Sequence, residues 1–487
     1  MFIFTGWVGI PLAFTVFCIQ VYTAILLGKC WVIAESLEAD ISSRNRSPYA
    51  ALAEMAYGRR TGTFVTLILG LTIFGGGIPN LLIASQNLQV MGLKLSSFEM
   101  DFSYCYWMII IGLFLCPLMW LGSPKDMKWL ALVSVFTVTA ASILTWVCLI
   151  KIEVDSPPPV PSPTWESVAI AYGILAFQFD IHPMILTVQI DMKDKNRLGQ
   201  AILLGFLVSG GMFLITTILV YTKLGTDVHY NTLQGLRTSV TLYAAIFLVT
   251  LQICLSMVVG SSPLFQNIED KLQIDPKFNW KRILVRTLLT LLGVAIAEAV
   301  PRFDLIMGLV GGSLTGQLMF IFPPLIYARL RSLQARRRVE SYVATHSDTF
   351  LGPPKYGTIA DPEDRALVFG LAPNDPTTFE DNAALVPRER FLKAVQRPVY
   401  GLPSSSMQVV PKRKAASISD HLYDIICLDK ALEEGPMSLC EKAFNGILLS
   451  AGVAATLIST YFSLQGTIEY GEFVPSCVVN VTMSFRL

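Results

Sequence analysis

The chain is 487 residues long, with 53% hydrophobic and 15% charged residues, a mean hydropathy of +0.54 and a formal net charge of +1. Soluble globular proteins carry about 25% charged residues, so this composition excludes an ordinary soluble domain and indicates an all-α polytopic membrane protein in a lipid bilayer. The near-zero charge, with no basic stripe outside the loops, argues against nucleic-acid binding.

Ten stretches are apolar and long enough to span a membrane, since a span needs about 20 apolar residues. They centre on Phe4–Leu27, Phe64–Leu88, Tyr104–Trp120, Leu130–Ile150, Trp165–Ile190, Ala201–Tyr221, Val240–Val259, Ile283–Ala299, Leu305–Tyr327 and Phe444–Leu464.

Lysine and arginine are distributed unevenly over the predicted loops. With the loop after the first span in the cytosol, the short cytosolic loops hold fourteen of these residues and the outer loops hold five. Because short cytosolic loops are enriched in Lys and Arg, this orientation places Met1 and the C-terminus outside. The tail contains the sequon Asn480-Val-Thr482, and Asn480 is therefore a glycosylation candidate, since sequons are modified on the lumenal side.

The fifth span, within Trp165–Met192, carries Asp180, His182 and Pro183 in its middle. Ionisable residues at membrane depth are costly and mark candidate functional sites. Pro183 removes the amide partner of the Phe179 carbonyl, and it disfavours helical dihedrals at His182. A break here is predicted, and an extended one would point both ionisable side chains to the same side. The alternative is a proline kink whose Asp–His pair only holds helices together.

Two other spans carry polar or small residues at helical spacing. Gly76 and Asn80 lie four apart in the second span, where they either line a site or serve helix packing. Ser256 in the seventh span is a candidate ligand for a hard cation such as sodium. The alternative is that its hydroxyl bonds to its own helix.

A polar segment separates the last span from the others. The sequence predicts a nine-span transmembrane bundle over 1–327 and a cytosolic, mostly disordered insertion over 328–441. It predicts a last span over 442–464 and an extracellular or lumenal tail over 465–487.

No catalytic or cofactor-binding motif accompanies these spans. The sequence contains no GxSxG, HExxH, Walker A or CxxC pattern, so we expect neither an enzyme nor a cofactor. Most of the nine cysteines lie inside apolar segments, and we interpret them as small core residues.

Five segments resemble the amino acid/auxin permease family of amino acid transporters, a branch of the APC superfamily, in the family's order. They are GWVGIPL (Gly6–Leu12), SPYAALAEMAYG (Ser47–Gly58), LGSPKDMKWLA (Leu121–Ala131), AFQFDIHPMILTVQIDM (Ala176–Met192) and VPRFDLIMGLVGG (Val300–Gly312). The nearest branch is that of animal proton-coupled and vesicular amino acid transporters.

The resemblance implies a broken-helix, inverted-repeat (LeuT-like) fold. The family's glycine-rich first helix should precede Gly6, and the sequence does not contain it, so the ten spans correspond to family helices 2–11. The resemblance also implies a short loop where this sequence has its 328–441 insertion.

The leading hypothesis is a secondary active amino acid transporter, whole or shortened, in the plasma membrane or a lysosomal or vesicular membrane. Its partners would be an amino acid and a coupling proton or sodium ion. The substrate-binding candidates are Gly76, Asn80, Phe177, Phe179, Asp180 and His182, and the ion-coupling candidates are Asp180, His182 and Ser256.

The alternative hypothesis is a non-transporting amino acid sensor or regulatory membrane protein that signals through the 328–441 insertion. The missing first helix and the long insertion both motivate it.

Overall fold

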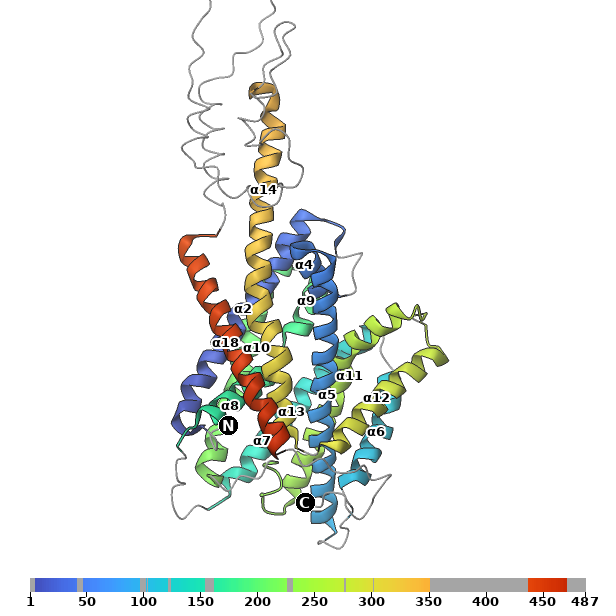
Figure 1. Cartoon of the computed structure of the whole chain (residues 1–487). Helices are drawn as coiled ribbons and strands as arrows, with labels where there is room; N and C mark the ends of the chain where they lie inside the picture. Colours follow the sequence, from blue (N-terminus) through green and yellow to red (C-terminus); the bar gives the residue numbers. More distant parts are fainter. Residues whose placement is uncertain are drawn as a thin grey trace, which may run out of the picture. The chain divides into compact units, whose positions relative to one another are not determined.

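A computed structural model of the chain describes residues 5–41, 47–96, 102, 104–120, 124–153, 162–225, 231–275, 277–300, 302–350 and 437–470. Within these ranges every assigned element is a helix (Figure 1). The longer helices are α2 (Gly9–Leu37), α4 (Pro48–Tyr57), α5 (Arg59–Leu95), α6 (Tyr104–Trp120), α7 (Pro124–Ile150), α8 (Trp165–Gln178), α9 (His182–Asp191), α10 (Leu198–Leu224), α11 (Val240–Lys271), α12 (Trp280–Ala299), α13 (Phe303–Val310), α14 (Phe322–Phe350) and α18 (Leu439–Tyr470). Short helical turns are η1 (Gly6–Val8), η2 (Lys195–Arg197) and the π-helices η3 (Gly311–Thr315) and η4 (Gln317–Ile321).

Eight of the described helical stretches are long and apolar enough to cross a membrane, which confirms an integral, multi-pass α-helical membrane protein. They are Gly9–Leu37, Arg59–Leu95, Trp129–Ile150, Trp165–Asp191, Lys195–Leu224, Val240–Lys271, Phe303–Ser341 and Leu439–Glu469. The other two predicted spans are also helices. Helix α6 is only 17 residues long, and α12 carries Arg286 and Glu298 within its 20 residues.

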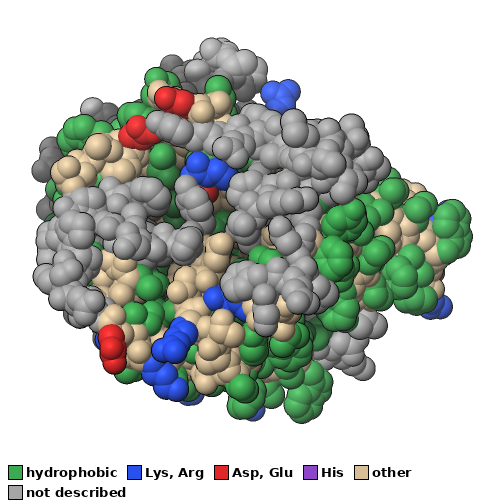
Figure 2. Space-filling view, turned by 90° about the horizontal axis from the view of Figure 1, so that it is seen from below, with side chains coloured by type: hydrophobic (Ala, Val, Ile, Leu, Met, Phe, Trp, Pro, Cys, Tyr) green, Lys and Arg blue, Asp and Glu red, His purple; other side chains and the backbone are tan. Residues whose placement is uncertain are grey.

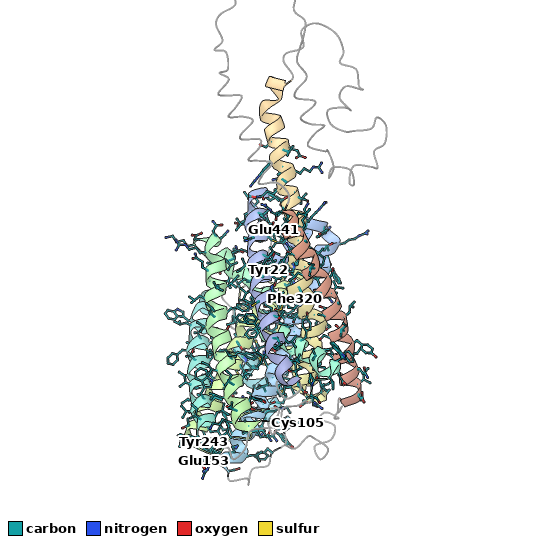
Figure 3. All side chains as sticks on the ribbon, turned by 90° about the vertical axis from the view of Figure 1, so that its left-hand side faces the viewer. Tyr22, Cys105, Glu153, Tyr243, Phe320 and Glu441 are labelled. Atoms are coloured by element: carbon teal, nitrogen blue, oxygen red, sulfur yellow. The ribbon has the colours of Figure 1, made fainter. Side chains whose placement is uncertain are left out.

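The helices of the main unit, Met1–Gln334 with Pro436–Leu487, pack around α5 and the broken span. Helix α11 lies against α7 and α5, α12 lies against α6 and α5, and α18 lies against α8 and α13. Figure 3 places Glu441 at one end of these helices and Cys105, Glu153 and Tyr243 at the other end.

Large apolar side chains remain exposed on the flanks of the helices, among them Phe14, Trp129, Phe136 and Leu204. Figure 2 shows hydrophobic side chains gathered along one edge of the face seen from below. Contiguous apolar surface of this kind marks membrane contact, and these flanks are the lipid-facing surface of the protein.

The helix predicted over Leu305–Tyr327 continues as α14 to Phe350, so the first part of the predicted 328–441 insertion is helical. The second compact unit is Ala335–Gly435. Residues 351–436 of the insertion lie outside the described residues, and so does Asn480. After the insertion, the chain returns at Met437, which is 5% exposed and packs in a core cluster with Trp31 and Tyr327.

The prediction that the cysteines are small core residues is confirmed for Cys30, Cys116, Cys148 and Cys254, which are buried and free. It is wrong for Cys18 and Cys440, which are exposed, and Cys105 is buried but disulfide-bonded. Cys105 lies in the first turn of α6, at the end of the helices rather than in mid-span (Figure 3).

Candidate functional site

The fifth predicted span is interrupted at Phe179–Ile181, as its proline predicts. Helix α8 begins with a capping box, in which Thr164 Oγ1 accepts from the Ser167 amide at 3.1 Å, and it ends at Gln178. Helix α9 begins at His182, with Pro183 in its first turn. Proline is tolerated there because the first amides of a helix have no intrahelical acceptor.

The break is a turn and not the extended segment that the sequence suggested. Phe179 has φ −112° and ψ 27°, Ile181 has φ −104° and ψ −17°, and the Asp180 amide donates to Phe177 O at 3.3 Å. His182 starts α9, so the expected loss of helical dihedrals at His182 is also wrong. The preference that proline imposes on its predecessor is outweighed by the contacts of the imidazole described below.

Gln20, in the middle of α2, binds the end of α8 that the break exposes. The last four carbonyls of a helix have no intrahelical partner, and Gln20 Nε2 lies 3.2 Å from Ala176 O and 3.5 Å from Leu175 O. The same nitrogen lies 3.1 Å from Met319 Sδ in η4. Because Gln20 is 0% exposed, these carbonyls are satisfied by protein and not by water.

Thr23, one turn further along α2, binds the imidazole at the start of α9. Thr23 Oγ1 lies 3.0 Å from His182 Nε2, and the threonine hydroxyl donates to its own helix, to Ile19 O at 3.0 Å. The tautomer of the imidazole sets which of the two groups donates in this contact. Nδ1 of the 0% exposed imidazole has no partner among the described residues.

Asp180 lies opposite the π-helical part of the ninth predicted span. Its Oδ2 accepts from Thr315 Oγ1 at 3.4 Å, and the His182 backbone amide also bonds to this carboxylate. Its Oδ1 is buried and has no partner among the described residues. Thr315 ends η3, and η4 follows directly after Gly316. Single π-helical turns inside α-helices are frequent at functional sites.

Two glycines let the broken span and η3 touch backbone to backbone. A Cβ on Gly311 would overlap the carbonyl oxygen of Gly173 and would lie 3.0 Å from Phe177 Cβ. Only glycine fits this approach, so two irregular backbone segments from distant parts of the chain lie directly against each other.

A cavity of about 670 Å³ adjoins the break. Asp180 is the one charged residue among its described lining residues. Phe179 also lines the cavity, and its ring packs against Phe206, Phe213 and Phe17 at centroid distances of 6.1, 5.3 and 5.5 Å. The rest of the lining comes from α7, α9 and α10 and is mostly apolar. The cavity is therefore suited to a partly apolar ligand with one cationic group.

The other candidates from the sequence lie elsewhere. Phe177 points away from this cavity toward α5, where a Cβ on Gly76 would lie 3.4 Å from its ring. Asn80 Nδ2 donates to Gly76 O at 3.2 Å. Ser256 Oγ donates to Ile253 O of its own helix at 2.9 Å. The structure thus groups Phe179 with Asp180, and Phe177 with Gly76 and Asn80, and it buries His182 behind the break.

Sequence reasoning missed three polar partners of the broken span, which are Gln20, Thr23 and Thr315. A signal existed for the first two, because a glutamine and a threonine three residues apart are unusual inside an apolar span. Neither their partners nor the role of Thr315 could be read from spacing, because the contacts join residues more than a hundred positions apart.

Residues 2–348 match the family described as "Transmembrane amino acid transporter protein". The chain belongs to this family. Among its relatives is amino acid transporter AVT1C of Arabidopsis thaliana, 23% identical over 344 residues, which are 69% of this chain and 59% of the relative. AVT1J of the same plant is 22% identical over 351 residues, 69% of this chain and 79% of the relative.

Sodium-coupled neutral amino acid transporter 4 of Mus musculus is 26% identical over 169 residues, 33% of this chain and 31% of that protein. The chain thus spans less than two thirds of the length of some relatives. Family membership confirms the resemblance read from the sequence, and the family and these relatives are transporters rather than enzymes.

Proposed function

We propose that this protein is a secondary active amino acid transporter, coupled to protons or sodium, that binds its substrate at the break between α8 and α9. The observation that carries the proposal is the position of Asp180, which lies in the break, lines the cavity of about 670 Å³ and has an unpartnered Oδ1. Its family and its relatives support amino acids as the substrate class.

The proposed binding geometry uses both ends of the break. The α-ammonium group of the substrate would bind Asp180 Oδ1, since a buried carboxylate oxygen requires a donor. The substrate carboxylate would lie near the N-terminus of α9, where the helix dipole favours an anion, although the amides of Met184 and Ile185 already donate to Ile181 O. Phe179 would contact the substrate side chain. Gly76, Asn80 and Phe177 lie together on the α5 side of α8, outside this cavity, and remain separate substrate-binding proposals.

Asp180 and His182 are the proposed ion-coupling groups. Asp180 Oδ1 would hold a proton or a sodium ion and His182 Nδ1 would exchange a proton, because neither atom has a partner among the described residues. Ser256 remains a further proposal, although its hydroxyl bonds within α11. We further propose that the ten helices are ten spans in a broken-helix, inverted-repeat arrangement equivalent to family helices 2–11. The plasma membrane and lysosomal or vesicular membranes are the proposed locations.

Uptake of labelled amino acids into proteoliposomes, with and without a pH gradient or a sodium gradient, tests the proposal. Asp180→Asn should abolish gradient-driven uptake. Asp191→Asn is the matched control, because Asp191 ends α9, is exposed and does not line the cavity. Absence of uptake by the wild-type chain for every amino acid would contradict the transporter proposal. If uptake by Asp180→Asn depends on the gradient as in wild type, the role of this carboxylate is contradicted, but the transporter proposal is not.

A further inference from the structure

A second, smaller cavity lies between α7, α10 and α11, beside the cavity at the break. Its volume is about 120 Å³, against about 670 Å³ for the larger one. Val138, Ser142 and Thr216 line both cavities, so the smaller one is a side chamber of the larger. We infer, in an argument that rests on the proposed function, that this chamber receives a substrate side chain that ends in a primary carboxamide, and that Gln252 is its specificity-determining residue.

Three hydroxyl groups line the side chamber. Ser142 and Thr145 come from one face of α7, and Thr216 comes from α10. Each of these hydroxyls donates to a carbonyl of its own helix at 2.8 Å, so its hydrogen is in use and its oxygen can act only as an acceptor. The Thr216 oxygen already accepts from Trp146 Nε1 at 2.8 Å. The oxygens of Ser142 and Thr145 are therefore the ones that would accept from a ligand.

Gln252, on α11, adds a carboxamide to the side chamber. Its side chain is half-buried and makes no hydrogen bond to another described residue. A carboxamide offers two N–H donors and a carbonyl acceptor, and polar groups inside a membrane-spanning helix pair with one another or mark a substrate pathway. The Gln252 carboxamide is therefore suited to a ligand group that donates and accepts hydrogen bonds at the same time.

The described lining of the side chamber disfavours charged and aliphatic side chains. It contains no acidic and no basic residue, so a charged side chain would be buried there without a counter-charge. An aliphatic side chain would leave the Gln252 carboxamide unpaired. A primary carboxamide matches the lining, because its carbonyl would accept from Gln252 Nε2 and its amide hydrogens would be donated to Gln252 Oε1 and to the oxygens of Ser142 and Thr145.

The two ends of the substrate would be bound by different helices. Asp180 lines only the larger cavity, where it would bind the α-ammonium group, whereas Thr145 and Gln252 line only the side chamber. Phe179 lines the larger cavity and would contact the methylene groups between the two ends. A change at Gln252 should therefore alter which side chain is preferred without removing the site of the α-ammonium group.

Uptake of matched pairs of labelled amino acids by the full-length chain in proteoliposomes tests the inference. Glutamine is compared with methionine, and asparagine with leucine, because the members of each pair are similar in size and only one carries a carboxamide. Wild type should take up at least one of the carboxamides about tenfold faster than its partner, since a site built to hydrogen-bond a group discriminates against an analogue that lacks it. Gln252→Met should bring this ratio close to one, without lowering the uptake of methionine or leucine.

Gln266→Met is the matched control, because Gln266 lies on the same helix, donates to Ser262 Oγ at 2.8 Å and lines neither cavity. Its uptake ratio should equal that of wild type. Thr145→Val is a second variant, which removes an acceptor oxygen and keeps the shape of the side chain, and it should lower the ratio a few-fold. Thr139→Val is its control, because the exposed Thr139 also donates within α7 and lines neither cavity.

Thermal unfolding in detergent provides a readout that does not need transport, because a ligand that binds only the folded protein raises its unfolding temperature. Glutamine or asparagine should raise this temperature more than its matched partner does, and Gln252→Met should remove the difference. Such stabilisation without any uptake would contradict the transporter proposal and support the chamber assignment. Equal stabilisation by both members of each pair, or none by any of the four, would overturn the chamber assignment, as would an unchanged uptake ratio in Gln252→Met.

Discussion

Two of the places where the described helices bury ionisable groups differ in how those groups are paired. At the junction of α11 and α12, Glu269 is bound by Arg286 Nε at 2.6 Å and lies 3.4 Å from Arg282 Nε. Arg286 also donates to Met119 O at 2.7 Å and lies 5.1 Å over the ring of Phe265. We call these residues the α11–α12 ion cluster.

At the break between α8 and α9 the pairing is incomplete. Asp180 accepts a long hydrogen bond from Thr315 and one from the His182 amide, while Asp180 Oδ1 and His182 Nδ1 have no partner among the described residues. An unsatisfied buried group destabilises the folded protein by about 1–3 kcal/mol. A ligand that binds the groups at the break would remove this penalty. The difference supports the proposal that the break binds a ligand, whereas the ion cluster stabilises the packing of α11 against α12.

The largest effect is expected in the ion cluster, from Glu269→Leu. Removing one partner of a buried ion pair costs about 3–5 kcal/mol, and here two guanidinium groups, 1% and 11% exposed in their side chains, lose their carboxylate. We expect a large drop in the thermal unfolding temperature in detergent, read by size-exclusion chromatography after heating.

The control is Asp194→Asn, which weakens the exposed pair of Arg197 and Asp194. Exposed pairs contribute about 0–1 kcal/mol, so this variant should unfold near the wild-type temperature. If Glu269→Leu also unfolds near the wild-type temperature, the ion cluster does not stabilise the protein. The structural role assigned to the cluster is then contradicted.

Gln20→Leu is expected to lower thermal stability less than Glu269→Leu does, and to lower transport more. This change removes the donor that satisfies Leu175 O and Ala176 O at the break, and the freed carbonyls cost about 1–3 kcal/mol. We expect uptake per folded molecule to fall about tenfold, since 1.36 kcal/mol in a barrier is a factor of ten, with a smaller loss of thermal stability than Glu269→Leu.

Gln200→Leu is the matched control for Gln20→Leu, because Gln200 is exposed on α10. Its uptake should equal that of wild type. If Gln20→Leu lowers only the unfolding temperature, and uptake per folded molecule is unchanged, then α2 supports the break in the same structural way as the ion cluster supports α12.

The sequence predicted the location of the break but not its surroundings. Pro183 removes a specific hydrogen bond, and this local effect identified Phe179–Ile181. The backbone there is a turn because Gln20 and Thr23 of α2 hold the two sides of the break close together. Such long-range contacts leave no trace in local spacing.

For the predicted spans too, one stretch of sequence predicts its own helix but not the contacts that the helix makes with others. Apolar length predicted each helix, yet it could not predict that α14 continues beyond Tyr327, or that α12 carries a buried arginine paired with α11. Likewise, nothing local to Cys105 indicates a disulfide. Features that depend on one stretch of chain were predictable, and features that depend on a partner were not.

The smallest effect is expected from Thr315→Val, which keeps the shape of the side chain and removes the hydroxyl that bonds Asp180. A single hydrogen bond contributes about 0.5–1.5 kcal/mol, and this one is long, at 3.4 Å. We expect wild-type thermal stability and a several-fold rise in the concentration of coupling ion that gives half-maximal uptake. Thr250→Val is the control, because the hydroxyl of the buried Thr250 donates to Ile246 O of its own helix at 2.8 Å and does not contact the break. Equal shifts in both variants would mean that the break responds to general repacking, whereas a shift confined to Thr315→Val would show that the hydroxyl tunes the free carboxylate.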